Sequence, residues 1–159
     1  MKRQYHLLAL LALAVVVLDQ ISKFIIDRSI PLHEFVTVIS GFFNLVHVRN
    51  RGMAFGLMNR PGNEFSFYFL VAATIGAVAL LLFWFSRLKK EERSLILGIS
   101  LILGGALGNL IDRIRFHEVI DFLDFYIGSY HWPAFNVADS AITIGTLWVA
   151  INMLFHKKA

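Results

Sequence analysis

The sequence contains no cysteine, which excludes a thiol nucleophile, a disulfide framework and zinc bound by cysteine. Its six histidines show no H-E-x-x-H spacing, so we do not expect a zinc peptidase of that type. A G-x-S-x-G motif, a phosphate-binding glycine loop and a recognisable RNA- or DNA-binding module are also absent from the sequence. We therefore predict no metal, no cofactor and no nucleic-acid partner.

Charged residues are scarce: they make up 16% of the 159 residues, whereas 57% are hydrophobic. Soluble domains are usually about 45–50% apolar. The apolar residues fall into long runs, and each run is close to the ~20 residues that a membrane-spanning helix needs. These runs are residues 7–26, 65–85, 94–111 and 136–155. We predict a mainly α, integral membrane protein with four transmembrane helices, organised as one domain over residues 1–159.

The first apolar run has two readings. It follows Met1-Lys2-Arg3 and contains Ala12-Leu13-Ala14, which is also how a cleaved secretory signal peptide begins. However, the small residues lie inside the apolar run, and the apolar character resumes after Asp19-Gln20. This pattern favours a first helix that stays in the protein.

The distribution of basic residues predicts the orientation in the membrane. The net charge is +4, and both termini and the short 87–93 segment are densely basic. Such clusters face the cytoplasm in most membrane proteins and also attract anionic lipid. We therefore expect both termini in the cytoplasm and the longer segments 27–64 and 112–135 outside it.

The outer segment 27–64 is more than a linker. Residues 35–39 and 42–48 are rich in β-branched and aromatic side chains, which predicts two short strands. Arg51-Gly52 and Arg60-Pro61-Gly62 are typical of turns. We expect a small sheet and a loop here, with some residues against the membrane surface.

Polar residues inside a membrane span are costly and often functional. Asp19 and Lys23 are four apart, so they share a helical face and can neutralise each other, either as a structural ion pair or in contact with a substrate. Asn109 needs hydrogen-bond partners at its depth in the third span. Asp112 and Arg113 either belong to the same polar group or form an ordinary charged helix end.

The strongest constellation of acidic residues lies around the start of the fourth span. Asp139 falls in its first turns, where the helix dipole favours a carboxylate. Asp121 and Asp124 belong to an amphipathic stretch that lies on the same side of the membrane. Two carboxylates in a partly dry site have pKa values that split, which is the basis of aspartic peptidase chemistry. Spacing alone leaves either Asp121 or Asp124 as the partner of Asp139, and a helix cap beside a solvated face stays an alternative.

At this point the sequence resembles the bacterial lipoprotein signal peptidases, or signal peptidase II. The resemblance spans nearly the whole chain and rests on several blocks that occur in the expected order on the expected spans. These blocks are LDQISK at 18–23, RNRGMAF at 49–55, GGALGNLIDR at 104–113, VIDF at 119–122 and FNVADS at 135–140.

The resemblance implies that Asp121 and Asp139 are the catalytic aspartates, and it leaves Asp124 outside the matched position. It also implies supporting or substrate-binding roles for a set of polar residues. This set is Asn50, Asn109, Arg113, Asn136, Asp19, Lys23 and Asp112.

The resemblance further implies the substrate and the location. The substrate would be a diacylglyceryl-prolipoprotein, cleaved just before its lipidated cysteine. The enzyme would lie in the bacterial cytoplasmic (inner) membrane with its active site near the extracytoplasmic interface, and cyclic peptides of the globomycin type would inhibit it.

The second block departs from the family's usual N-x-G-A-A-F-S. Met53 replaces a small residue and Gly56 replaces the serine, which puts the local shape of the substrate-facing loop in doubt. Two functions from other classes predict different behaviour. A small transporter would move solute and cleave nothing, and a scaffold would tolerate loss of both aspartates.

Overall fold

The computed structural model describes residues 2–52, 64–89 and 92–155. In these ranges the chain forms four long helices and one four-stranded sheet. The elements in chain order are α1 (Lys2–Ser29), β1 (Phe35–Ile39), β2 (Phe43–Asn50), α2 (Glu64–Arg87), α3 (Arg93–Phe116), β3 (Val119–Ile127), β4 (Tyr130–His131) and α4 (Val137–Phe155).

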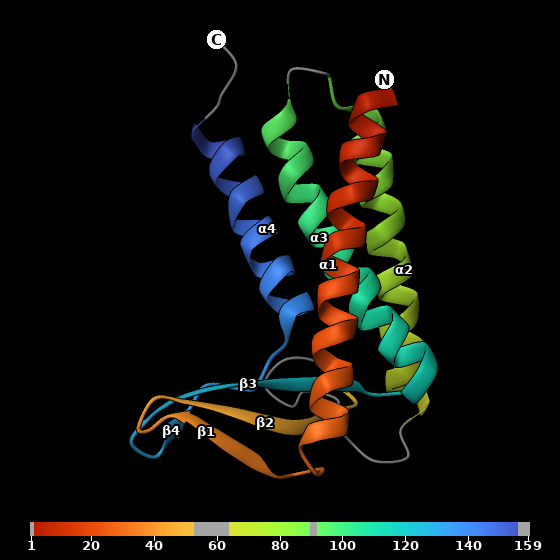
Figure 1. Cartoon of the computed structure of the whole chain (residues 1–159). Helices are drawn as coiled ribbons and strands as arrows, with labels where there is room; N and C mark the ends of the chain where they lie inside the picture. The colour runs from red at the N-terminus through yellow and green to blue at the C-terminus, as the bar shows by residue number, and fades with distance from the viewer. Residues whose placement is uncertain (1, 53–63, 90–91, 156–159) are drawn as a thin grey trace.

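The helices form a bundle, and the sheet crosses the end of the bundle opposite the two chain termini (Figure 1). α3 is the central helix, because it contacts α1, α2 and α4. Each of the four helices is long and apolar enough to cross a membrane. The predicted mainly helical membrane fold is confirmed, and α1 is one continuous helix of 28 residues.

Glycines on α3 allow its neighbours to approach closely. A Cβ atom on Gly104 would lie 2.6 Å from the Cβ of Val15 on α1. A Cβ on Gly105 would lie 2.3 Å from the carbonyl oxygen of Ala138 on α4. Small residues have this role in membrane helices, where packing replaces the hydrophobic effect as the force between helices. The two glycines bring α1 and α4 against the same stretch of α3.

The sheet is antiparallel in the order β1-β2-β3-β4. β1 and β2 lie where the sequence predicts strands, between the first two helices. β3 and β4 come from the connection between α3 and α4, and β3 occupies the stretch interpreted from sequence as merely amphipathic. The pairing of β2 with β3 places Val48 opposite Asp121 and Asn50 opposite Val119.

The first three helices extend beyond the predicted apolar runs, and one predicted turn has a different form. α3 continues to Phe116, so the outer segment that begins at residue 112 starts as helix. The predicted turn at Arg51-Gly52 is a bend directly after β2. The predicted turn at Arg60-Pro61-Gly62 and the two departures at Met53 and Gly56 lie outside the described residues.

Candidate active site

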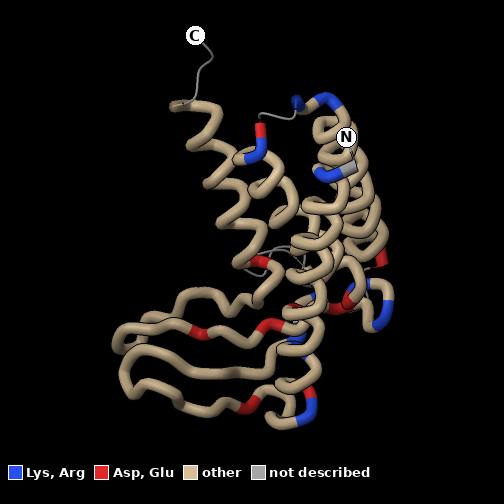
Figure 2. The backbone as a smooth tube through the Cα atoms, turned by 45° about the horizontal axis from the view of Figure 1, so that its top comes forward, with Lys and Arg blue, Asp and Glu red and all other residues tan. Residues whose placement is uncertain are grey.

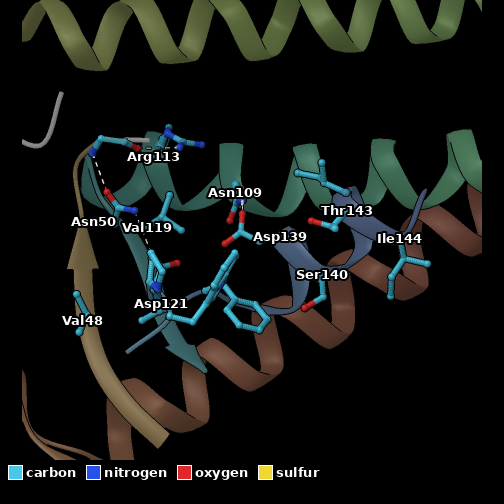
Figure 3. Close-up of a pocket in the computed structure, with 16 residues that line it drawn as sticks. Val48, Asn50, Asn109, Arg113, Val119, Asp121, Asp139, Ser140, Thr143 and Ile144 are labelled. Carbon is cyan, nitrogen blue, oxygen red and sulfur yellow. Dashed lines mark hydrogen bonds between the residues drawn. The ribbon is translucent and has the colours of Figure 1, made fainter. Parts of the chain in front are cut away.

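A cavity of about 700 Å³ opens where the sheet meets the bundle. β2, α3, β3 and the first turns of α4 contribute to its lining. Asp121 and Asp139 both line it, and Figure 3 shows their side chains within the same pocket, from β3 and α4 respectively. The structure therefore brings together the two aspartates that the resemblance selects.

Asp121 is the third residue of β3 and is buried. Its Oδ2 accepts a hydrogen bond from Asn50 Nδ2 at 3.0 Å, and its Oδ1 accepts one from Asn136 Nδ2 at 2.7 Å. Burial, followed by the negative charge of Asp139, raises the pKa of Asp121 to about 7, against the lowering effect of the two amide hydrogen bonds. Asp121 can therefore keep a proton near neutral pH.

Asp139 lies in the first turn of α4, and a capping box holds it there. The backbone N–H of Asp139 donates to Asn136 Oδ1 at 2.9 Å, and Asp139 Oδ2 accepts from the backbone N–H of Asn136 at 3.3 Å. The other oxygen, Oδ1, accepts from Asn109 Nδ2 at 2.8 Å. These three hydrogen bonds fix the position of the Asp139 carboxylate at the positive end of the helix dipole.

Asn136 links the two aspartates. Its side chain is completely buried, and its amide nitrogen donates to Asp121 while its amide oxygen accepts from Asp139. The same amide nitrogen lies 3.3 Å from Asn109 Oδ1. One asparagine therefore fixes the position of Asp121 relative to the start of α4.

A buried ionic cluster lies behind the cavity. Lys23 Nζ is 2.8 Å from Asp19 Oδ2, 2.9 Å from Asp112 Oδ2 and 2.9 Å from Asn109 Oδ1. The three protons of the ammonium group thus have three acceptors. Lys23 is 2% exposed, and Asp19 and Asp112 are 0% and 1% exposed. None of the three lines the cavity, so a substrate in the cavity would not touch them directly.

The ionic cluster is connected to the cavity through Asn109. Asn109 Oδ1 accepts from Lys23, which leaves the amide nitrogen to donate to Asp139. The cluster also holds the start of α4, because Asp19 Oδ1 accepts from the backbone N–H of Ala138 at 2.9 Å. Asp19 and Lys23 therefore support both the side chain and the helix that carry Asp139.

Arg113 is the cation closest to the aspartates among the lining residues. Its Nη2 donates to the carbonyl oxygen of Gly52 at 3.4 Å, and its buried Nε has no hydrogen-bond partner in the described residues. Figure 3 shows its side chain at the edge of the pocket near Asn50. Arg113 offers a positive charge and a free donor beside the two carboxylates.

Asp124 lies outside the cavity. Its carboxylate accepts from Asn44 Nδ2 at 3.0 Å and lies 2.9 Å from His131 Nδ1. Sequence reasoning missed one residue of the ionic cluster, Gln20, whose amide nitrogen donates to Asp112 Oδ1 at 2.9 Å. Its position beside Asp19 inside an apolar span was the available signal.

Comparison with known proteins decides the family. The sequence profile described as Signal peptidase (SPase) II matches residues 11–155. The chain belongs to the signal peptidase II family. It is 44% identical to the lipoprotein signal peptidase of Syntrophus aciditrophicus (strain SB), over 99% of this chain and 98% of the relative. It is 48% identical to that of Oleidesulfovibrio alaskensis, over 99% and 100%.

The fold agrees with this assignment. A bacterial membrane enzyme solved by the in meso method at 2.3 Å resolution superposes with a TM-score of 0.84 at 35% identity, over 95% of this chain and 91% of that one. A second, solved at 1.9 Å resolution, gives 0.83 at 33% identity. This signal peptidase II homologue is thus a multi-pass membrane peptidase that acts in the removal of signal peptides from lipoproteins.

Proposed function

We propose that this protein cleaves diacylglyceryl-modified prolipoproteins just before the lipidated cysteine, with Asp121 and Asp139 as its catalytic pair. One observation carries the proposal. Two carboxylates from separate elements line one cavity, and the charge of Asp139 helps to raise the pKa of Asp121 to about 7. A pair that shares one proton at neutral pH is what aspartic peptidase chemistry requires.

The proposed reaction is general acid–base hydrolysis. Ionised Asp139 takes a proton from a water molecule, and the water oxygen attacks the scissile carbonyl carbon. Protonated Asp121 donates a hydrogen bond to the developing oxyanion. The peptide C–N bond then breaks, and the leaving nitrogen receives a proton from the pair. The products are a signal peptide with a new carboxylate and a lipoprotein with a free amine on its lipidated cysteine.

The surrounding residues support this division of labour. Asp139 accepts hydrogen bonds from Asn109 and from the start of α4, which hold its carboxylate in the cavity. Arg113 lines the same cavity and is a suitable partner for the oxyanion or for a substrate carbonyl. The apolar part of the lining includes Ile142 and Ile144 on α4. This part fits a lipidated substrate and would also bind cyclic peptides of the globomycin type.

The test compares three aspartates. Asp121→Asn and Asp139→Asn are each incubated with lipidated precursor in detergent, and the products are identified by mass spectrometry. We expect each variant to lose at least about 100-fold in turnover. Asp124→Asn, on the same strand as Asp121 but outside the cavity, is the matched control and should stay within a few-fold of wild type.

Thermal unfolding shows whether each variant is folded. A folded Asp121→Asn or Asp139→Asn enzyme with near-normal turnover would show that Asp121 and Asp139 are not the catalytic pair. Solute flux in liposomes without precursor cleavage by the wild type would point to the transporter alternative.

We also propose that the termini lie in the cytoplasm and the cavity near the outer face of the inner membrane. The support is that the termini and the short 87–93 segment are densely basic in sequence. Figure 2 shows Lys and Arg at both ends of the bundle, but most of the Asp and Glu at the sheet end. Because the sequence has no cysteine, single cysteines report location cleanly. A membrane-impermeant maleimide added to intact spheroplasts should label Ser129→Cys and not Ser86→Cys. The opposite pattern would invert the orientation.

A further inference from the structure

A second cavity lies at the other end of the bundle, far from the two aspartates. Its volume is about 500 Å³, and it is formed by the first turns of α1 and α3. The lining combines basic or polar side chains with apolar ones. The residues that matter here are Arg3, His6, Arg93, Leu7, Leu10 and Ile96.

The two arginines of this cavity lack an acidic partner. Within the described ranges, neither Arg3 nor Arg93 makes an ion pair or a side-chain hydrogen bond. Other basic residues of the molecule are used differently, since Arg49 pairs with Asp27 and Arg87 stacks on Phe83. Two uncompensated positive charges beside one cavity favour an anionic ligand.

The walls of the cavity are held in place by packing. Gln4 Nε2 donates to the carbonyl oxygen of Lys89 at 3.1 Å, which ties the start of α1 to the chain just before α3. The rings of Tyr5 and Phe85 meet edge to face, with centroids 5.0 Å apart. Ile96, which lines the cavity, is also part of the apolar core beneath it. The cavity is therefore largely preformed, as ligand sites usually are.

The position of the cavity indicates that the anionic ligand is a lipid. The cavity lies at the ends of two helices that can cross a membrane, and Leu10 in its lining is exposed on the outside of the bundle. Lipid headgroups sit at this level of a membrane-spanning helix, and an exposed leucine there would face lipid. We propose that it binds one anionic phospholipid, with the phosphate between Arg3 and Arg93 and an acyl chain along Leu7 and Leu10. Arginine suits this role because its planar guanidinium group binds phosphate through paired hydrogen bonds. A soluble phosphate would leave the apolar part of the lining unused.

The experiment measures lipid binding to the full-length protein by native mass spectrometry. Protein in nonionic detergent is titrated with phosphatidylglycerol or with phosphatidylcholine of the same chain length. We expect wild type to retain one phosphatidylglycerol in preference to phosphatidylcholine. Arg3→Gln and Arg93→Gln should each weaken this binding about five-fold, and the double variant about 25-fold.

The matched control is the double variant Arg87→Gln with Lys89→Gln, which removes two charges at the same end of the bundle but outside this cavity. It should keep the single tight lipid. Equal losses in both double variants would mean a diffuse basic surface and would overturn the proposal. So would an Arg3/Arg93 double variant that binds like wild type.

A third experiment distinguishes a phospholipid from a soluble phosphate as the ligand. Glycerol 3-phosphate at a concentration comparable to that of the lipid should not displace the bound phosphatidylglycerol, because the acyl chain contributes to binding. Complete displacement at that concentration would mean that the site binds a soluble phosphate and not a lipid. Unchanged thermal unfolding shows that these variants are folded, so the outcome does not depend on the proposed peptidase mechanism.

Discussion

The two halves of the helix bundle are built from different kinds of side chain. The half near the termini has an apolar core, and its buried Asn152 and Ser100 bond within their own helices. The half near the sheet buries charges and amides that bond from one helix to another. The apolar core consists of Leu8, Ala12, Phe85, Ile96, Ile99, Leu103 and Val149. The polar half contains Asp19, Lys23, Asn109, Asp112 and Asn136.

The contrast shows how the position of each helix is fixed. Apolar packing fixes the positions of helices only through their shapes, and in lipid the exposure of a leucine costs little. A buried hydrogen-bond donor without its acceptor costs free energy, so the helix that carries the donor must lie where the acceptor is within reach. Lys23 on α1 reaches Asp112 and Asn109 on α3, while Asp19 holds the start of α4. The polar half therefore sets the register of three helices, and the cavity lies where that register is most tightly fixed.

The largest effect should come from breaking the ionic cluster. Lys23→Met leaves two buried carboxylates without their cation, which should cost about 3–5 kcal/mol of stability. In the fraction that folds, Asn109 loses the partner that orients its amide toward Asp139, so kcat should fall roughly 100-fold with little change in KM. Lys89→Met, an exposed change in the other half, should affect neither. An Lys23→Met enzyme with normal kcat would show that the cluster does not position Asp139.

A glycine comparison tests the close approach of helices in the polar half. Gly105→Ala would place a Cβ atom 2.3 Å from the backbone oxygen of Ala138, which cannot move without moving α4. We expect about 1–3 kcal/mol of destabilisation and a clear loss of cleavage, measured by thermal unfolding and by precursor assay. Gly76→Ala is the control, because a Cβ on Gly76 meets nothing within 4 Å. If Gly105→Ala and Gly76→Ala had the same stability and the same cleavage activity, a clash with the backbone of Ala138 would not be the cause.

The pH profile of cleavage should be determined by groups in the polar half alone. Burial and the charge of Asp139 raise the pKa of Asp121 to about 7, so the proton needed by the proposed mechanism is lost as pH rises through that value. Cleavage should fall about tenfold per pH unit above it. Asn50→Ala removes a donor that favours the charged form, so this limb should move to higher pH. If the alkaline limb of the pH profile did not move in Asn50→Ala, a group other than Asp121 would determine it.

The smallest effect should come from the apolar half. Ile99→Val removes one methyl group from a fully buried position and should cost about 1 kcal/mol of stability. The register of the polar half is unaffected, so kcat and the pH profile should match wild type when measured below the unfolding temperature. A changed pH profile in Ile99→Val would mean that the two halves are coupled and that the comparison is too simple.

The helices and the first two strands were predictable because their patterns are local. Long apolar runs predict spans, and β-branched residues at 35–39 and 42–48 predict strands. β3 was not recognised because its aspartates, Asp121 and Asp124, interrupt the apolar residues every third position and hide a period of two. A strand is recognised here only through its pairing with β2, which is a long-range property.

The missed strand also explains why spacing left two candidates for the partner of Asp139. Residues three apart share a face in a helix but lie on opposite faces of a strand. On β3, Asp121 faces the cavity, whereas Asp124 contacts Asn44 and His131. The resemblance to known peptidases selected Asp121 because it carries information about this fold. The role of Asn109 as the link to Lys23 depends on the positions of three helices and was not visible in any local pattern.

The hydrogen bond from Ala138 to Asp19 joins groups 119 residues apart in the chain. A growing polypeptide that has inserted its first three helices therefore still lacks Asn136 and Asp139, and the carboxylate of Asp19 still lacks its partner at the start of the last helix. If Asp121 and Asp139 are the catalytic pair as proposed, such a nascent chain cannot yet hydrolyse a peptide bond. The protease would become active only after its last helix has been synthesised and inserted. Neither neighbouring proteins nor the enzyme itself would be cleaved during its synthesis.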